Sequence, residues 1–301
     1  MKNNALRSPL FYVGDKYKIV NEIKSHFPNN IETFVEPFVG GGSVFMNVRA
    51  QRFLLNDIDK NIIEIHEMLC GYADCTSKFF DKVNVIVEHY GLSCSYKKDI
   101  VPNDLKKEFV KTFYARFNKS AYEQMRLDYN QSVEKSPFVL YMLLIYGFNR
   151  MIRFNKSGNF NLPVGNVDLN QNTIDALNNY FVQAKQKNPI WYNLDFENFG
   201  NRITLTMNDF VYLDPPYLIT FSEYNKYWNE ETEKRLLRFL DSLNVQGIRF
   251  AISNVTHYKG KINQIFLDWS KRYNSYPIKS NYISYHDNTN KVFNEVLVTN
   301  Y

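Results

Sequence analysis

The sequence of 301 residues has few cysteines and histidines, three and five respectively. Cys70, Cys75 and Cys94 show neither the paired CxxC spacing of a zinc site nor the even number of a disulfide framework, and the histidines are scattered. We therefore expect a reduced, cytoplasmic protein that binds no metal.

Long hydrophobic runs are also missing. The N-terminus has no apolar signal core, and the longest apolar stretch, residues 138–148, is too short to span a bilayer. Ser136 is a suitable helix cap before this stretch, and Pro137 fits a first helical turn. The pattern predicts a buried helix here and a protein without a membrane contact. There is no internal repeat or low-complexity tract.

Charge of one sign is only slightly in excess, with 36 basic against 31 acidic residues and a net charge of +5. The distribution says more, because residues 111–160 contain eight basic and three acidic residues. The net charge of these residues is therefore +5, which equals the net charge of the whole chain. A charge run is more often a solvated face than a binding surface, but one of this size also indicates a segment that binds nucleic acid.

The hydrophobic content of 45% is ordinary for a folded protein with a sizeable core. Helices are predicted at 17–27, within most of 58–148 and after a cap at Asn229. β-Branched and aromatic segments predict strands at 31–35, 53–55, 209–214, 248–254 and 294–301. Strands at both ends of the chain indicate one α/β domain with an insertion. We expect the sheet domain to comprise residues 1–60 and 190–301, and the mostly helical insertion residues 61–189, with a hairpin near 147–166.

A glycine-rich turn follows the first predicted strand, after Glu36 and Phe38. Successive glycines at Gly40, Gly41 and Gly42 let the backbone approach a ligand, although a plain tight turn is an equally good interpretation of the glycines alone. Asp57 ends the next strand, 17 residues after Gly40, where a carboxylate can accept both hydroxyls of a ribose. Together these features predict an adenosine site. The GxGxxG and GK[ST] patterns are absent, which disfavours NAD and ATP.

The tetrapeptide Asp214-Pro215-Pro216-Tyr217 directly follows an apolar strand, where open α/β sheets place their ligands. A proline-stiffened turn is the alternative. An adenine amine is a poor nucleophile because its lone pair is conjugated into the ring. If the Asp214 carboxylate and the Pro215 carbonyl each accept one amine hydrogen, the lone pair is freed for a methyl donor. Tyr217 offers a ring on which an extruded base can stack.

The motifs VEPFVGGGSVF, LLNDID, VYLDPPY and FNRMIRFNKSGNFNLPVG together resemble the Dam-type DNA adenine methyltransferases, including those of restriction-modification systems. The resemblance covers most of the chain, and the motif order is the same. It implies a class I S-adenosylmethionine-dependent methyltransferase, with a Rossmann-like sheet and an inserted, mainly helical target-recognition domain. It also implies S-adenosyl-L-methionine as methyl donor, base flipping, and palindromic double-stranded DNA targets that often contain GATC or a GAT element.

Site residues follow from the same resemblance. The segment FYVGDK is similar to a KWxGxK element of the family, with Tyr in place of Trp, and Asp195-Phe196 is similar to a pair that flanks the adenine of the cofactor. The implied cofactor-binding residues are Tyr12, Lys16, Glu36, Phe38, Gly40, Gly41, Gly42, Asp57, Asp195, Phe196 and Asp214. The implied catalytic residues are Asp214, Pro215, Pro216 and Tyr217. The implied DNA contacts are Asn149, Arg150, Arg153, Asn155 and Lys156.

Two other functions stay open at this point. DPPY-type motifs also occur in methyltransferases that act on RNA bases, and a catalytically silent DNA-binding relative would keep the sheet as a scaffold. The basic insertion favours duplex DNA, and the intact DPPY motif with Asp57 favours an enzyme. We further expect a monomer, with a cognate restriction endonuclease as a possible partner.

Overall fold

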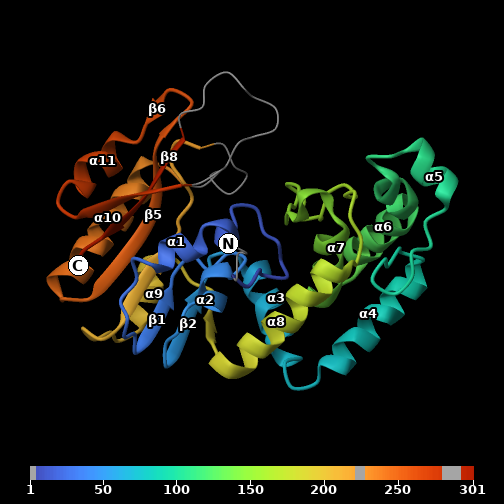
Figure 1. The fold of residues 1–301 in the computed structure, drawn as a ribbon, viewed down its shortest axis with the longest axis horizontal. Helices are drawn as coiled ribbons and strands as arrows, with labels where there is room; N and C mark the ends of the chain where they lie inside the picture. Colours follow the sequence, from blue (N-terminus) through green and yellow to red (C-terminus); the bar gives the residue numbers. More distant parts are fainter. Residues whose placement is uncertain (1–4, 221–227, 280–292) are drawn as a thin grey trace.

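The computed structural model describes residues 5–220, 228–279 and 293–301. Within these residues one eight-stranded sheet has the order β3-β2-β1-β4-β5-β8-β7, with β6 paired to β5 (Figure 1). The strands are β1 Thr33–Glu36, β2 Arg52–Asn56, β3 Ile190–Tyr192, β4 Phe210–Leu213, β5 Arg249–Tyr258, β6 Lys261–Ile262, β7 Asn274–Ile278 and β8 Phe293–Thr299.

The helices fall into two groups, one around the sheet and one beside it. Those around the sheet are η1 Lys16–Lys18, α1 Val20–Lys24, α2 Ser43–Asn47, α3 Lys60–Gly71, α8 Gln171–Lys187, α9 Phe196–Arg202, α10 Glu230–Val245 and α11 Gln264–Ser270. Those beside it are α4 Thr76–Tyr90, α5 Asn103–Glu108, α6 Phe113–Gln131, α7 Pro137–Tyr146 and η2 Phe148–Arg150.

Five neighbouring strands of the sheet are parallel, from β3 through β2, β1 and β4 to β5. Their carboxyl ends therefore meet at one edge of the sheet, where ligands of open α/β sheets bind. β8 lies between β5 and β7 and is antiparallel to both. Because of this reversed direction, the first residues of β8 lie at the edge where the parallel strands end.

Each face of the sheet is covered by helices, which gives three layers. Alternate residues of a strand point to opposite faces. Phe34 and Phe210 belong to one core with residues of α1, α2, α3 and α8. Val35 and Val211 belong to a second core with residues of α9, α10 and α11. The strands are thus apolar on both faces, as in a buried parallel sheet.

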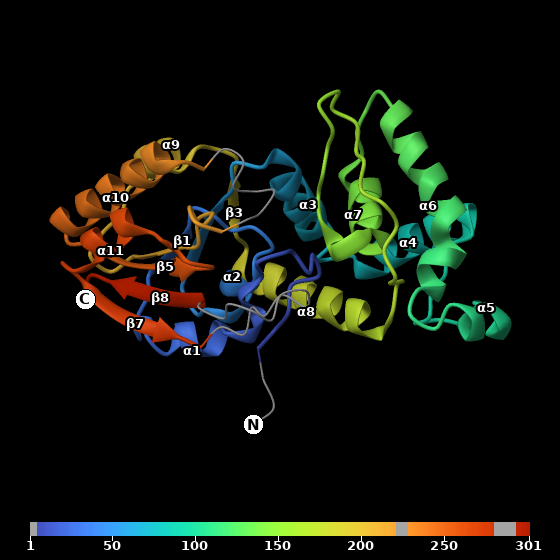
Figure 2. The ribbon, with the colours of Figure 1, turned by 90° about the horizontal axis from the view of Figure 1, so that it is seen from above.

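The helices α4 to α7 form a separate lobe beside the sheet domain (Figures 1 and 2). α3 contacts α7 of this lobe and β3 of the sheet. α8 contacts α4 of the lobe through the Phe181 and Phe79 rings, 5.1 Å apart, and packs on α2 and α3 beside the sheet. α7 is the centre of the lobe, and its Ser136 cap accepts a hydrogen bond from the Val139 N–H at 3.4 Å. The helix predicted from Ser136 and Pro137 is confirmed.

Several elements differ from the prediction. The helix expected at 17–27 is split into η1 and α1, because Ile19 between them has φ −117° and ψ 0°. β3 and β7 were not predicted. β3 is only three residues long, and β7 contains Pro277, which a strand tolerates at the edge of a sheet.

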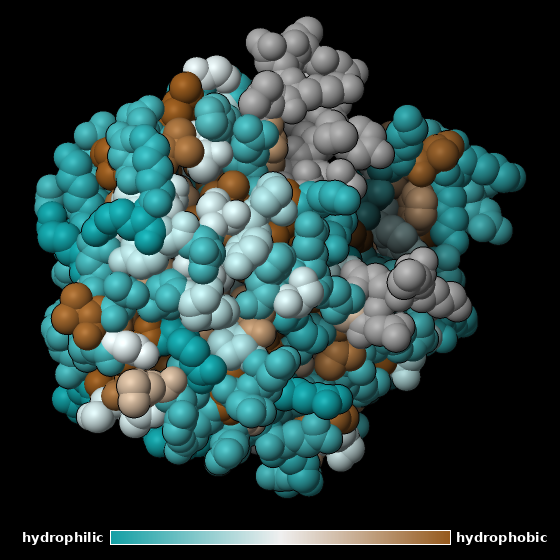
Figure 3. Space-filling model, turned by 60° about the vertical axis from the view of Figure 1, so that its left-hand side comes forward, coloured by the Kyte–Doolittle hydropathy of each residue, from teal (hydrophilic) through white to brown (hydrophobic). Residues whose placement is uncertain are grey.

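One face of the molecule is mainly hydrophilic, with apolar side chains in small separate groups (Figure 3). Among the described residues, no helix is both long and apolar enough to cross a membrane.

Candidate active site

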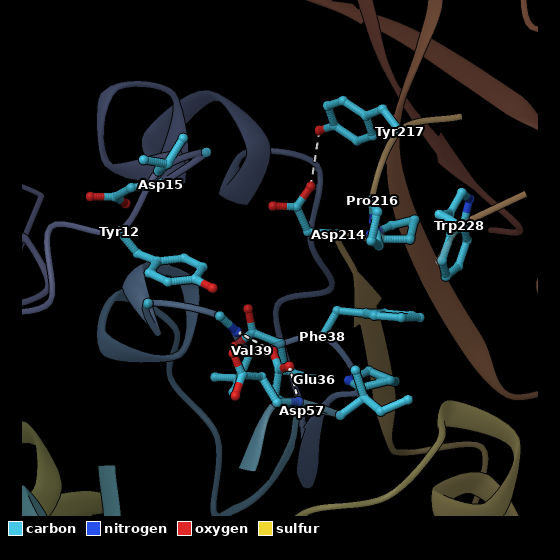
Figure 4. A pocket seen from close by; sticks show the side chains of 18 of the residues that line it. Tyr12, Asp15, Glu36, Phe38, Val39, Asp57, Asp214, Pro216, Tyr217 and Trp228 are labelled. Carbon is cyan, nitrogen blue, oxygen red and sulfur yellow. Dashed lines mark hydrogen bonds between the residues drawn. The ribbon is translucent and has the colours of Figure 1, made fainter. Parts of the chain in front are cut away.

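A cavity of about 920 Å³ opens at the carboxyl ends of β1, β2 and β4. This is at the upper end of the range for small-molecule sites, about 300–1,000 Å³. Figure 4 shows its acidic and aromatic side chains, with Asp214 and Tyr217 at one end and Glu36 and Asp57 at the other. The predicted catalytic residues and all predicted cofactor residues line this one cavity.

The glycine turn after β1 forms one wall of the cavity. Gly42 has φ +78°, a left-handed conformation that favours glycine, and a Cβ added there would lie 2.5 Å from the Phe45 ring. A Cβ on Gly41 would lie 2.8 Å from the Cβ of Tyr12. Gly41 and Gly42 are therefore packed too closely for any larger residue, and the turn lines the cavity.

Asp57 ties this turn to the end of β2. Its Oδ2 accepts the Gly40 N–H at 2.9 Å and its Oδ1 accepts the Asp59 N–H at 2.9 Å. Burial raises the pKa of Asp57 to about 6, although both N–H groups oppose this rise. A carboxylate has about four lone-pair sites, so each oxygen can accept a further hydroxyl. The geometry suits the two hydroxyls of a ribose.

His66 of α3 fixes the same turn from the other side. Its Nε2 lies 2.9 Å from the Gly40 carbonyl oxygen and its Nδ1 2.8 Å from the Tyr180 hydroxyl. A carbonyl only accepts, so Nε2 carries the hydrogen and Nδ1 accepts from Tyr180. Burial lowers the pKa of His66 to about 4, which keeps the ring neutral. A single histidine among the apolar residues of a helix gave no signal of this role in the sequence.

Aromatic side chains form a slot beside Asp57. The rings of Phe38 and Phe196 lie 5.6 Å apart, and those of Phe38 and Trp228 lie 5.7 Å apart. Asp195 caps α9 by accepting the Glu197 N–H at 3.0 Å, which places Phe196 in the slot. A flat base such as adenine can stack against rings of this kind. Trp228 was not among the predicted residues.

At the other end of the cavity, Asp214 and three other polar side chains lie close together. The Lys16 Nζ lies 2.8 Å from Asp214 Oδ2, and the Tyr217 hydroxyl lies 2.9 Å from Asp214 Oδ1. Glu295 of β8 completes the group, with Oε1 2.9 Å from the Tyr217 hydroxyl. Burial raises the pKa of Asp214, and Lys16 opposes the rise. Glu295 was not predicted, since no motif surrounds it.

Glu36 is a second buried acid near Asp214. It is 2% exposed, and its Oε2 has no hydrogen-bond partner among the described residues. Burial raises its pKa well above the usual value, and the nearby Asp214 adds to this. A buried carboxyl with one unpartnered oxygen fits a cationic group of a ligand. With the diol site at Asp57 and the aromatic slot, the side chains suit a nucleoside that carries a positively charged tail.

The predicted hairpin extends from the helical lobe toward this cavity. Phe154 and Phe160 form an isolated antiparallel bridge, and Gly158 has φ +76° in the turn. Arg153 lines the cavity. Its Nε donates a hydrogen bond to Asn161 Oδ1 and its Nη2 donates one to the Asn161 carbonyl oxygen, at 2.9 Å each. The remaining predicted contacts at the surface, Asn149, Asn155 and Lys156, are exposed.

Arg150 differs from the expectation for a DNA contact. It is 9% exposed, and its guanidinium carbon lies 3.8 Å from the centre of the Phe11 ring. Stacking of a guanidinium on an aromatic face is favourable, and here it holds the side chain inside the protein. This burial disfavours a direct contact of Arg150 with DNA, and we leave it out of the DNA contacts proposed below.

Within the described ranges 5–220, 228–279 and 293–301, no three His, Cys, Asp or Glu side chains are grouped so that they could hold a metal ion.

The strand order with an antiparallel β8, the glycine turn after β1, the acid after β2 and the DPPY motif after β4 define a class I methyltransferase. The family model of the D12 class N6 adenine-specific DNA methyltransferases matches residues 12–283, and the chain belongs to this family. The resemblance inferred from the motifs and the predicted α/β fold are thereby confirmed.

Individual relatives agree. The chain is 36% identical to the modification methylase StsI of Streptococcus sanguinis over 98% of its own length. It is also 36% identical to the type II methyltransferase M.FokI of Planomicrobium okeanokoites over 99% of its length. It spans 43% of the length of each of these two relatives. The DNA adenine methylase of Vibrio cholerae is 30% identical, over 73% of this chain and 69% of that relative.

Proposed function

We propose that the chain transfers a methyl group from S-adenosyl-L-methionine to the exocyclic 6-amino group of adenine in a short double-stranded DNA motif. The observation that carries this proposal is the position of Asp214. It directly follows β4 and lines the same cavity as the diol acceptor Asp57 and the aromatic slot. A nucleoside cofactor and an extruded base therefore have adjoining places in one cavity.

The chain's own residues supply the activation of the amine. Asp214 and the Pro215 carbonyl accept its two hydrogens, which turns the nitrogen lone pair toward the methyl donor. The amine gains a methyl group and loses one proton, for which Asp214 is the acceptor. Pro216 restricts the backbone that positions these acceptors, and the Tyr217 ring provides a stacking face for the extruded base.

S-adenosylmethionine fits the cavity by the chemistry of its groups, and it supplies an electrophilic methyl on a sulfonium when bound. Asp57 would accept the ribose hydroxyls, Phe38 and Phe196 would flank the adenine, and Glu36 would face the cationic amino group. Tyr12, Lys16, Asp195 and the three glycines complete this set.

Duplex DNA would reach the cavity along the helical lobe. We propose that this lobe is the main part of the target-recognition domain predicted at residues 61–189, whose first and last helices, α3 and α8, lie against the sheet. Reaction at a base inside the duplex requires that the base is flipped out, at a cost of a few kcal/mol. Arg153 lines the cavity and lies in the hairpin, so it is our candidate for a base contact. The exposed Lys156 is our candidate for a phosphate contact.

Cofactor binding should weaken as the pH falls below about 6. Only the ionised Asp57 accepts two hydroxyl hydrogens well, and burial raises the pKa of this carboxyl to about 6. The dissociation constant of S-adenosylmethionine should therefore rise by up to about tenfold for each pH unit below that value. Calorimetric titrations of the wild type and Asp57→Asn measure this. The Asn variant should bind more weakly and with little of this pH dependence; an equal dependence in both proteins would contradict the assignment.

Arg153→Ala and Lys156→Ala should weaken DNA binding in different ways. Loss of a base contact at Arg153 should reduce the preference for target over non-target duplex by about 1–3 kcal/mol. Loss of a phosphate contact at Lys156 should weaken binding to both duplexes alike and reduce the slope of log affinity against log salt by about 1. Fluorescence anisotropy at several salt concentrations distinguishes them. An unchanged preference in Arg153→Ala would remove Arg153 from the reading surface.

The activity itself is tested with radiolabelled S-adenosylmethionine and unmethylated genomic DNA, followed by mapping of the modified adenines. Methylated adenines in one short motif support the proposal and identify the target. Label in structured RNA but not in DNA supports an RNA methyltransferase, and absence of cofactor binding supports a catalytically silent DNA-binding protein. A cytoplasmic location, a monomeric state and a partner restriction endonuclease stay predictions.

A further inference from the structure

Glu295 lies outside the region that the family model matches, residues 12–283, yet it belongs to the site. β8 runs antiparallel to β5, so Glu295, near the start of β8, lies at the edge of the sheet where Asp214 follows β4. Its side chain has no exposed surface. Its partners across the sheet, Val255 on β5 and Ile278 on β7, are apolar.

The titratable groups that face Glu295 among the described residues come from two other segments. Lys16 of η1 has its Nζ 3.6 Å from Glu295 Oε1, and the Tyr217 hydroxyl lies 2.9 Å from the same oxygen. Asp214 shares both of these partners, at 2.8 Å from Lys16 and 2.9 Å from Tyr217. Glu36 lies on the opposite side of Asp214 from Tyr217 (Figure 4). The second oxygen of Glu295 has no hydrogen-bond partner among the described residues.

The charges of this group are unequal. Two carboxylates, Asp214 and Glu295, share one ammonium at Lys16, so the ionised group has a net charge of −1. A pair of Lys16 and Asp214 alone would be neutral. The ammonium would then make the Asp214 carboxylate a weaker acceptor for a hydrogen of the target amine. A buried acid that is incompletely paired costs stability, so its presence needs a reason other than folding.

We propose that Glu295 is a positioning residue that offsets the charge of Lys16, so that the Asp214 carboxylate is a stronger acceptor for a hydrogen of the target amine. This inference rests on the function proposed above. The net charge of −1 also complements a cation in the cavity: the sulfonium before transfer and the methylated amine after it. A neutral ligand gains nothing from this charge.

Glu295→Gln keeps the size of the side chain and removes its charge. Glu295 raises the pKa of Asp214, so the substitution should lower that pKa and shift the acid limb of the pH profile of kcat/KM to lower pH. A less basic acceptor should also lower kcat about tenfold at neutral pH. If Glu295 had a purely structural role, the substitution would lower activity without shifting the acid limb of the pH profile to lower pH.

Binding provides a measurement that does not depend on turnover. S-adenosylmethionine and S-adenosylhomocysteine differ by the methyl group and the positive charge on sulfur. Glu295→Gln should reduce the preference for the charged ligand over the neutral one by about tenfold, as measured by calorimetry. Asn294→Ala, at an exposed position of the same strand, is the matched control and should leave the preference unchanged.

The outcomes separate this inference from the proposed function. Equal losses for both ligands, or an unshifted acid limb, would overturn the role of Glu295 while the wild type still methylates DNA. A wild type that does not methylate DNA would instead contradict the function. If Glu295→Gln does not fold, Glu295→Asp serves as the test. It retains the charge and should retain the preference for S-adenosylmethionine, so a lost preference in this variant would also overturn the inference.

Discussion

Asp214→Ala should lower kcat for methyl transfer at least about 10³-fold while leaving the affinity for duplex DNA within a few-fold of the wild type. We propose this carboxylate, which lies 2.8 Å from the Lys16 Nζ, as the acceptor of an amine hydrogen. The DNA contacts that we propose lie on the hairpin of the helical lobe. Single-turnover transfer to a labelled duplex and an anisotropy titration measure the two quantities.

Asp209 provides the control for damage to the fold. It lies just before β4, at the opposite end of the strand from Asp214, and accepts the Thr33 N–H at 2.9 Å. Asp209→Ala should destabilise the protein by about 1–3 kcal/mol through the lost hydrogen bonds, with near-normal transfer per folded molecule. Near-normal turnover in Asp214→Ala, or an equal loss of turnover in both variants, would contradict the role given to Asp214.

Gly42→Ala should weaken S-adenosylmethionine binding more than tenfold and destabilise the protein by about 2–4 kcal/mol. The left-handed backbone at φ +78° costs a non-glycine residue about 1–2 kcal/mol. The added Cβ would also lie 2.5 Å from the Phe45 ring and 3.0 Å from the His66 ring, which adds an overpacking cost of about 1–3 kcal/mol. Displacement of His66 releases the Gly40 carbonyl, so the turn facing the cofactor should move.

Gly260→Ala is the control that separates the cost of the left-handed backbone from the cost of close packing. Gly260 has the same φ of +78°, and a Cβ added there meets nothing within 4 Å. Gly260→Ala should therefore show only the backbone cost, with unchanged cofactor affinity. Thermal denaturation and calorimetry of both variants measure this difference. If Gly42→Ala matches Gly260→Ala in stability and affinity, close packing of the turn is not what shapes the cofactor site.

The sequence by itself determined the elements whose signals are local. The strands β1, β2 and β4 are each followed within four residues by a predicted ligand-binding residue, Gly40, Asp57 and Asp214, because the carboxyl end of a parallel strand is also its end along the chain. The Ser136 cap and the Asn229 cap likewise lie next to the helices they begin. Family membership followed from these motifs and their order.

Only the tertiary structure decided the contacts between distant segments. Glu295 contacts Tyr217, 78 positions earlier in the chain, because β8 runs antiparallel beside β5. His66 contacts the Gly40 carbonyl from α3. Arg150 matches a motif of exposed DNA contacts, yet Phe11 from the N-terminal segment buries it. Sequence spacing cannot show such partners, since burial and pairing depend on which segments the fold brings together.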